Sequence, residues 1–125
     1  MLTKTHHIAI LCSDYRRSRE FYVDKLGFQV VKEVRRPERQ DTLTMLRCGD
    51  VTLELFTRPD APARLTQPEA LGLRHLAFSV ENVEWEKAWL EGMGIGVEPI
   101  REDPVNGGRM TFFRDPDGLP LEIHE

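Results

Sequence analysis

Gly72-Leu73-Arg74-His75-Leu76-Ala77-Phe78-Ser79-Val80 is the stretch that decides the fold of this chain. Most of its residues are apolar and it contains one histidine, which is consistent with a buried strand that carries a histidine. Residues 5–10, Thr-His-His-Ile-Ala-Ile, match residues 73–78 at an offset of 68. The same offset carries Thr52–Phe56 onto Pro120–His124. An internal sequence repeat at a fixed offset predicts two copies of one structural unit.

The repeat carries the residues that suggest chemistry. His7 is followed 47 residues later by Glu54, and His75 is followed 47 residues later by Glu122. A histidine and a glutamate repeated at one interval indicate a site to which both copies contribute, rather than four unrelated residues.

Each copy is predicted to run strand, helix, strand, strand, strand, which makes the fold class α+β with two βαβββ modules. We expect a single domain over residues 1–125, with repeats at about 4–57 and 72–125 and a proline-containing linker at 58–71. Neither repeat is expected to be stable alone. Expected elements of the first repeat are strands at 5–12, 28–34, 42–48 and 51–56, a charged loop at 35–41, and a helix at 15–26 that Ser13-Asp14 caps and Gly27 ends.

In the second repeat, Asn82 is expected to cap a helix that breaks at Gly92-Met93-Gly94, and Trp85 and Trp89 are expected to pack in the core. Gly27 matches Gly94 at an offset of 67, so one residue slips within the helix and is restored by the last strand. Strands are expected at 73–80, at 95–101 (weak, because of its proline), at 110–114 and at 119–124, with a turn at 115–118.

Composition excludes several classes of protein. The chain has 125 residues, of which 40% are hydrophobic and 30% charged, with a net charge of −4. This suits one small domain with a core and argues against a nucleic-acid partner, which needs a basic stripe. Arg35-Arg36, the densest basic point, is read as a solvated surface. No run is apolar and long enough for a membrane helix, and no signal peptide is seen, so a cytoplasmic location is expected. Cys12 and Cys48 are expected as small hydrophobes in a reducing compartment.

Strand geometry places the four repeated residues on one kind of face. Side chains alternate along a strand, and in each motif strand the His or Glu lies opposite an aliphatic row that a helix should cover. Two imidazoles and two carboxylates suit a divalent ion such as Zn, Ni, Co, Mn or Fe, and with a dication their charges sum to zero. We therefore predict one metal per site, held by His7, Glu54, His75 and Glu122. His6, which has the opposite parity, and His124, near the terminus, are weaker candidates.

At these residues the sequence resembles the vicinal oxygen chelate superfamily, which includes glyoxalase I, bleomycin-resistance proteins, fosfomycin-resistance enzymes, methylmalonyl-CoA epimerase and extradiol dioxygenases. The resemblance covers nearly the whole chain. It rests on the His7 strand with Asp14 and Phe21-Tyr22…Leu26-Gly27-Phe28, on Leu53-Glu54-Leu55, on residues 74–78, and on Phe113–Gly118…Leu121-Glu122-Ile123. It implies sheets that curl around a metal cavity. The His, Glu, His, Glu order is most similar to glyoxalase I.

The resemblance implies a lyase or isomerase that acts on a small α-oxo or α-hydroxy compound through a metal-bound enediolate. Glu122 would be the base that moves the proton, with Glu54 as its partner. Two positions depart from glyoxalase I: Leu11 replaces an arginine and Arg58 replaces an asparagine, both of which grip glutathione. A glutathione hemithioacetal is therefore only one of several candidate substrates.

The same residues are compatible with two other kinds of function. One is a non-catalytic small-ligand-binding protein of the bleomycin-resistance kind, and another is an epimerase or dioxygenase of the same superfamily. Glyoxalase I-like proteins of this length commonly pair two chains, so the resemblance favours a homodimer with metal sites shared between the chains. The linker at 58–71 is long enough for a site within one chain as well.

Overall fold

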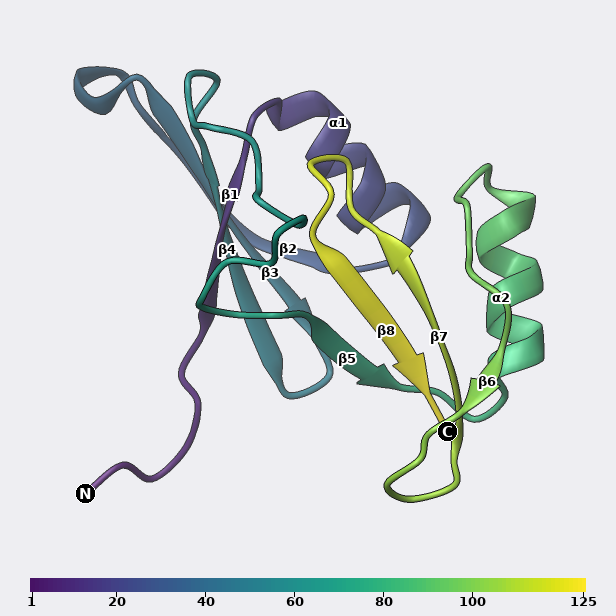
Figure 1. Cartoon of the computed structure of the whole chain (residues 1–125). Coiled ribbons are helices and arrows are strands. Elements are labelled where there is room, and N and C mark those ends of the chain that lie inside the picture. Colours follow the sequence, from purple (N-terminus) through teal and green to yellow (C-terminus); the bar gives the residue numbers. More distant parts are fainter. The chain divides into compact units, whose positions relative to one another are not determined.

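Each half of the chain is built on one four-stranded sheet and one helical segment (Figure 1). The computed structural model describes residues 1–125 and divides them into two compact units, Met1–Pro62 and Ala63–Glu125. The fold class is α+β with two βαβββ modules, as predicted. No helix of the chain has both the length and the apolar character that crossing a membrane requires.

The first unit has the strand order β1-β4-β3-β2. β1 and β4 run parallel, and the other neighbours are antiparallel. A parallel pair needs a long crossover, and here the helix and two strands between β1 and β4 supply it. The elements are β1 (Ile8–Cys12), α1 (Tyr15–Arg19), the π-helix η1 (Glu20–Lys25), β2 (Gln29–Arg36), the 3-10 turn η2 (Pro37–Arg39), β3 (Asp41–Cys48) and β4 (Val51–Thr57).

The second unit repeats this plan with the order β5-β8-β7-β6, and β5 and β8 are again the parallel pair. Its elements are β5 (Leu76–Ser79), α2 (Val83–Gly92), β6 (Arg101–Glu102), β7 (Arg109–Arg114) and β8 (Pro120–His124). Asn82 caps α2, because its side-chain oxygen accepts a hydrogen bond from the Trp85 N–H at 2.9 Å.

The register of the parallel strands reproduces the sequence repeat. Ala9 lies opposite Glu54 in the first unit, and Ala77 lies opposite Glu122 in the second. Both positions are 68 residues apart in the sequence. The sequence repeat is therefore also a repeat of strand register, and the two glutamates occupy equivalent positions in the two sheets.

The predicted one-residue slip has a structural explanation in the first helix. The caps Asp14 and Asn82 are 68 residues apart, whereas Gly27 and Gly94, which follow the helices with φ of 77° and 79°, are 67 apart. The first helix therefore carries one residue more, and η1 absorbs it as a π-helix, the usual form of a single insertion in an α-helix. The last turn restores the offset, since Arg114 pairs with Pro120 where Arg47 pairs with Thr52.

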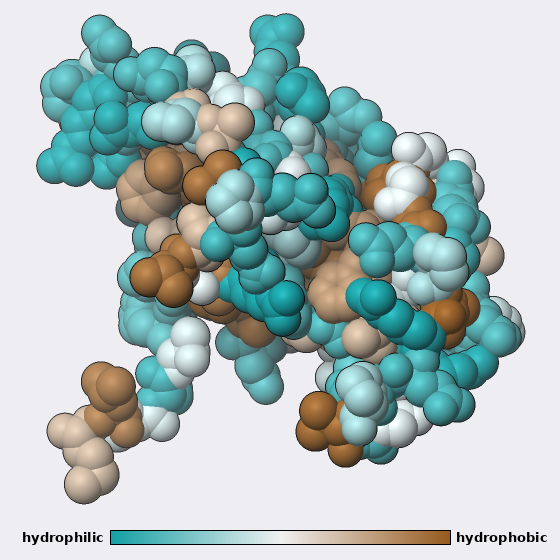
Figure 2. All heavy atoms as spheres, viewed as in Figure 1, coloured by the Kyte–Doolittle hydropathy of each residue, from teal (hydrophilic) through white to brown (hydrophobic).

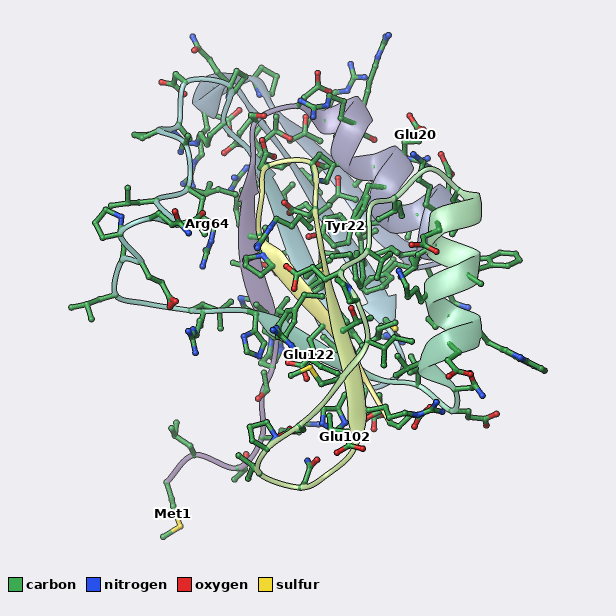
Figure 3. The ribbon with its side chains drawn as sticks, turned by 45° about the vertical axis from the view of Figure 1, so that its right-hand side comes forward. Met1, Glu20, Tyr22, Arg64, Glu102 and Glu122 are labelled. Carbon is green, nitrogen blue, oxygen red and sulfur yellow. The ribbon has the colours of Figure 1, made fainter.

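Each sheet buries one face under its helical segment. In the first unit Phe21 and Tyr22 of η1 are buried with an aliphatic row of the sheet, and Tyr22 is fully enclosed (Figure 3). The buried row there is Ile10, Cys12, Leu46, Leu53 and Leu55. In the second unit Val83 and Leu90 of α2 and Ile95 are buried with Leu76, Phe113, Leu121 and Ile123. The predicted aliphatic rows are thus the core, and the faces that carry Glu54 and Glu122 lie opposite them.

Three expectations about local structure were wrong. The motif strands begin at Ile8 and Leu76, so His7 and His75 precede them. The expected strand at 95–101 is reduced to one isolated bridge, Val97 to Phe113, and to Arg101, where the short β6 begins; Pro99, between them, has no N–H to donate to a strand. β2 continues through Arg36, so the charged loop shrinks to residues 37–40.

Trp85 and Trp89 do not pack in the core as expected. They are 80% and 64% exposed. The buried stripe of α2 passes through Val83 and Leu90, seven residues apart, and the tryptophans lie on another side of the helix. The face of the molecule shown in Figure 2 is largely hydrophilic, with apolar side chains scattered over it.

Candidate functional site

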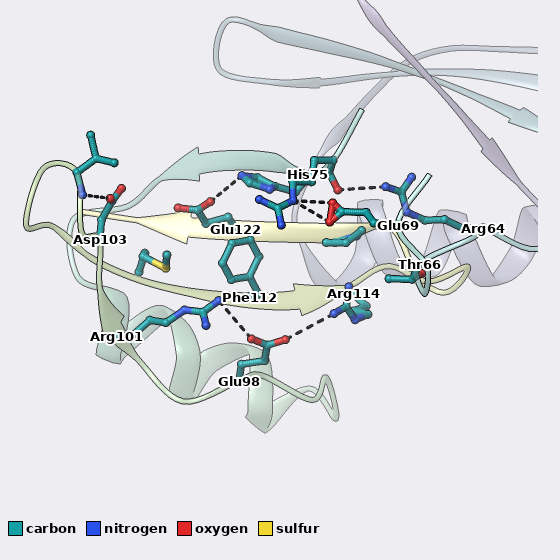
Figure 4. Close-up of a pocket in the computed structure, with 14 residues that line it drawn as sticks. Arg64, Thr66, Glu69, His75, Glu98, Arg101, Asp103, Phe112, Arg114 and Glu122 are labelled. Carbon is teal, nitrogen blue, oxygen red and sulfur yellow. Dashed lines mark hydrogen bonds and ion pairs between the residues drawn. The ribbon is translucent and has the colours of Figure 1, made fainter. Parts of the chain in front are cut away.

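His75 and Glu122 form the histidine–carboxylate pair of the second unit. The His75 Nε2 atom lies 2.9 Å from Glu122 Oε2. β8 holds Glu122 between its register partners Ala77 on β5 and Phe112 on β7 (Figures 3 and 4). Its side chain is 8% exposed, whereas that of His75 is 33% exposed. A buried carboxylate is costly without a cation or donors, so this position calls for a positively charged partner.

His7 and Glu54 form the equivalent pair of the first unit. The His7 Nε2 atom lies 3.4 Å from Glu54 Oε2, and the side chains are 37% and 15% exposed. β4 holds Glu54 between Ala9 on β1 and Met45 on β3. His6, the weaker candidate, places its Nδ1 atom 2.8 Å from His7 Nδ1. It therefore neighbours the pair without joining the carboxylate.

Each pair supplies two metal-binding side chains and no more. The chain shows no group of three or more His, Cys, Asp or Glu side chains that could hold a metal ion. The predicted set of His7, Glu54, His75 and Glu122 is therefore present as two halves, one in each unit. The joining of the halves stays a prediction.

A cavity of about 530 Å³ opens beside His75 and Glu122 in the second unit (Figure 4). Alternate residues of two neighbouring strands form its floor: Met110, Phe112 and Arg114 from β7, and Pro120 and Glu122 from β8. This is the face opposite the buried row, and the period of two explains why these side chains point the same way. Linker residues Arg64, Thr66 and Glu69 also line the cavity.

Phe112 lies between the histidine–carboxylate pair and a cation. Its ring meets the ring of His75 edge to face at 5.1 Å between centroids. The guanidinium carbon of Arg101 lies over the same ring, 5.1 Å from its centroid. A cation over an aromatic face is attracted by the ring quadrupole, so Phe112 holds Arg101 one ring away from His75.

His124 has a partner of its own. Its Nε2 atom lies 3.0 Å from Asp103 Oδ2, and its Nδ1 atom lies 2.5 Å from the Glu125 carbonyl oxygen. The bond to Asp103 is the main cause that raises the pKa of His124. The pKa of Asp103 is lowered, first by the N–H of Val105 and then by His124. This pair ties the loop after β6 to the end of β8.

An ion pair that sequence reasoning missed lies at the far end of β2 and β3. Arg36 donates two hydrogen bonds to Asp41, at 2.7 and 2.6 Å, and the Asp41 side chain is fully buried. Arg36 also lies over the ring of Phe56. Arg36 is thus no solvated surface residue. The two residues are register partners, which is a fact about strand pairing that the local sequence does not show.

The two positions that depart from glyoxalase I are both accessible. Leu11 is 59% exposed on the face that carries Glu54. Arg58 places its Nε atom 3.8 Å from Asp41 Oδ2, and its side chain is 49% exposed. Leu11 presents an apolar surface where an arginine would present a charge.

Comparison with known proteins places this geometry in a family. Residues 4–123 match the model of the Glyoxalase/Bleomycin resistance protein/Dioxygenase superfamily. The chain is 53% identical to the protein YwkD of Bacillus subtilis (strain 168), over 100% of this chain and 98% of that protein. It is similar to the solved structure of the glyoxalase family protein from Enterococcus faecalis, with 52% identity, a TM-score of 0.93, and coverage of 98% and 97% of the two chains.

More distant relatives carry names that state an activity. Glyoxylase I 4 of Arabidopsis thaliana is 31% identical, over 98% of this chain and 70% of that protein. The 2-epi-5-epi-valiolone epimerase of an Actinomyces species is 29% identical, over 94% and 76%. The family match spans nearly every residue, and both histidine–carboxylate pairs fall inside it. The chain therefore belongs to the Glyoxalase/Bleomycin resistance protein/Dioxygenase superfamily.

Proposed function

We propose that this chain is a metal-dependent enzyme that moves a proton between neighbouring carbons of a small α-oxo or α-hydroxy compound. The observation that carries the proposal is the pair of equivalent His–Glu contacts, His7 with Glu54 and His75 with Glu122, on parallel strand pairs of the same register. Two equivalent half-shells are what a single four-ligand site needs from two modules.

The donor set fits a divalent ion. Each unit brings an imidazole Nε2 atom and a carboxylate oxygen to within 3.4 Å or less of one another. Glu122 in particular is a buried carboxylate beside a histidine, a setting that a cation would stabilise. Zn, Ni, Co, Mn and Fe all accept such nitrogen and oxygen ligands. A bound ion would act as a Lewis acid on the oxygens of the substrate.

Glu122 is the residue that we propose as the base. It would take a proton from a carbon of the substrate and return it to the neighbouring carbon, while the electron pair shifts through the adjacent carbonyl group. Substrate and product are then isomers, so no oxidant or reductant is needed. General-base help of this kind contributes about 10²–10⁴-fold. Glu54 holds the equivalent place in the first unit and is the near-symmetric partner of Glu122.

The relatives leave the substrate open. Those named as a glyoxylase I and as an epimerase are compatible with this class of reaction, whereas others are named as metallothiol or glutathione transferases. Leu11 argues against glutathione binding of the glyoxalase I type, because an alkyl side chain cannot form an ion pair with a carboxylate of glutathione. We therefore propose a small substrate other than a glutathione adduct.

Two measurements test the proposal together. The first is the metal content of protein purified without added metal, for wild type and for His75→Ala. The second is proton–deuterium exchange at carbon, followed by NMR, for a panel of α-hydroxy ketones, α-keto acids and glutathione hemithioacetals in D₂O with each divalent ion. We expect bound metal in wild type, less in His75→Ala, and exchange that depends on Glu122.

Two results would contradict this proposal. If His75→Ala and Glu122→Ala both keep full metal with unchanged affinity, the metal site is wrong. If metal binds but no compound exchanges a carbon-bound proton, the chain is a ligand-binding protein of the bleomycin-resistance kind. Robust turnover of the methylglyoxal–glutathione hemithioacetal, with kcat/KM in the ordinary enzyme range of about 10⁴–10⁸ M⁻¹s⁻¹, would contradict the exclusion drawn from Leu11.

A further inference from the structure

The cavity of the second unit is lined by four arginines and four carboxylates, and two of these carboxylates face histidines rather than arginines. The four arginines are Arg64, Arg74, Arg101 and Arg114. Two of its four carboxylates are engaged elsewhere, because Glu122 contacts His75 and Asp103 contacts His124. A third, Glu69, accepts both of its hydrogen bonds from Arg74, at 2.8 and 2.9 Å.

The three remaining guanidinium groups have one carboxylate between them. Arg64 donates to the backbone carbonyl oxygens of Leu73 and Arg74, which carry no formal charge. Arg101 and Arg114 both approach Glu98, one at each of its oxygens, as Figure 4 shows. The distances are 3.7 and 3.6 Å, too long for hydrogen bonds. The two guanidinium groups therefore keep donors free for an anion.

The two arginines lie near Phe112, the residue whose ring contacts His75. Arg114 shares the face of β7 with Phe112, and Arg101 lies over the Phe112 ring, whose other neighbour is His75. A group bound between the arginines would thus be separated from the His75–Glu122 pair by about one aromatic ring. Arginine forks recognise carboxylate and phosphate oxygens in pairs, and such charge-assisted bonds are strong.

We propose that Arg101 and Arg114 form an anion-binding subsite, and that the substrate carries a carboxylate or phosphoryl group beyond its reacting carbons. This inference rests on the proposed function for the identity of the reacting end, but the anion site itself does not need the metal. Glu98, the carboxylate that both arginines approach, would compete with an anion bound between them.

Anion binding is measured with a chelator present, so that no metal takes part. The anion-binding proposal is therefore tested separately from the metal proposal. Inorganic phosphate and malonate are titrated into the full chain, and binding is followed by backbone amide shifts in NMR. Arg101→Gln and Arg114→Gln should each weaken binding about tenfold, the effect of losing one charge-assisted contact. Arg16→Gln, an exposed arginine on α1 in the other unit, is the matched control and should change nothing.

Glu98→Gln gives a test that a misfolded protein cannot imitate. It removes the shared carboxylate and leaves the backbone bonds of residue 98, from its N–H to Phe112 and from Thr111 to its carbonyl, in place. Anion binding should then become several-fold tighter. If phosphate binds more tightly than malonate, the anionic group of the substrate is a phosphoryl group; if malonate binds more tightly, it is a carboxylate. The proposal is overturned if Glu98→Gln does not tighten binding, if Arg101→Gln and Arg114→Gln combined bind as wild type does, or if wild type binds neither anion.

Discussion

At the scale of single residues, the two glutamates of the repeat differ in their surroundings. Glu122 is more buried than Glu54, with 8% against 15% of the side chain exposed, and it lies closer to its histidine. A carboxylate that is better shielded from water interacts more strongly with a nearby cation. We therefore expect Glu122 to contribute more to metal affinity than Glu54.

Replacing Glu122 with glutamine removes the charge and keeps the volume. Changes around metal ligands cost about 10–100-fold in affinity, and loss of a ligand carboxylate should cost at least that much. Competition with a chromophoric chelator measures the metal affinity. Glu98→Gln, a carboxylate of the same cavity outside the four-residue set, is the control and should keep the affinity of wild type. Equal affinities for Glu122→Gln and wild type would remove Glu122 from the site.

The ion pair of His124 with Asp103 predicts a dependence of stability on pH. A raised pKa for His124 means stabilisation that is complete below its unfolded pKa and is lost as the pH rises through the folded one. A lowered pKa for Asp103 means stabilisation that is present above its unfolded pKa and is lost as the pH falls through the folded one. The pair therefore stabilises the fold most strongly between the unfolded pKa of Asp103 and the unfolded pKa of His124, a range on the acid side of neutrality.

Asp103→Asn tests this, because the amide oxygen can still accept from the Val105 N–H while the charge is gone. Urea unfolding with a chelator present should show wild type more stable than the variant near pH 6, and the difference should shrink as the pH rises towards 9. A difference that stays constant or grows over this range would show that the contact acts without the charge of His124.

At the scale of elements, the sequence was sufficient where a strand or a cap follows from local pattern. The cap at Asn82, the glycine exits at Gly27 and Gly94, and the aliphatic rows were all predictable. What it missed depends on strand pairing and on which side of a helix packs. Asp41 is buried in an ion pair because β2 and β3 pair it with Arg36, and the tryptophans of α2 are exposed because Val83 and Leu90 lie on the packed side.

The π-helix gives a prediction at this scale. If η1 holds one inserted residue, deletion of the exposed Asp24 should let the segment relax to an α-helix with little loss of stability. Deletion of the exposed Ala88 from α2 should instead turn the buried Leu90 away from the core, at a cost of about 2–5 kcal/mol. Thermal unfolding of both variants measures the contrast. Equal losses of stability in the two variants would show that the π-helix η1 does not arise from one inserted residue.

At the scale of the whole molecule, the repeat itself was the most informative feature of the sequence. The offset of 68 predicted two modules, and strand pairing reproduces it at Ala9 with Glu54 and at Ala77 with Glu122. The same offset predicted which four residues matter, and each unit brings its own two together. What a repeat cannot show is which copy of the second module completes the shell of the first, because that depends on surfaces far apart in the sequence.

We predict that the shell is completed between two copies of the chain. In a symmetric dimer, each site would take His7 and Glu54 from one chain and His75 and Glu122 from the other. A protein with His7→Ala and Glu54→Ala would then have no intact site, and neither would one with His75→Ala and Glu122→Ala. A mixed dimer of the two would have one intact site and one empty one.

Subunit exchange between these two variants is therefore the measurement. After equal amounts are mixed and exchange is complete, half of the dimers are mixed, so about a quarter of the wild-type metal capacity should return. Differently tagged subunits, seen by native mass spectrometry, report whether exchange has occurred, and each variant alone is the control. If mixed dimers form and no metal binding returns, the four ligands come from a single chain, and residues 58–71 must bring the two modules together.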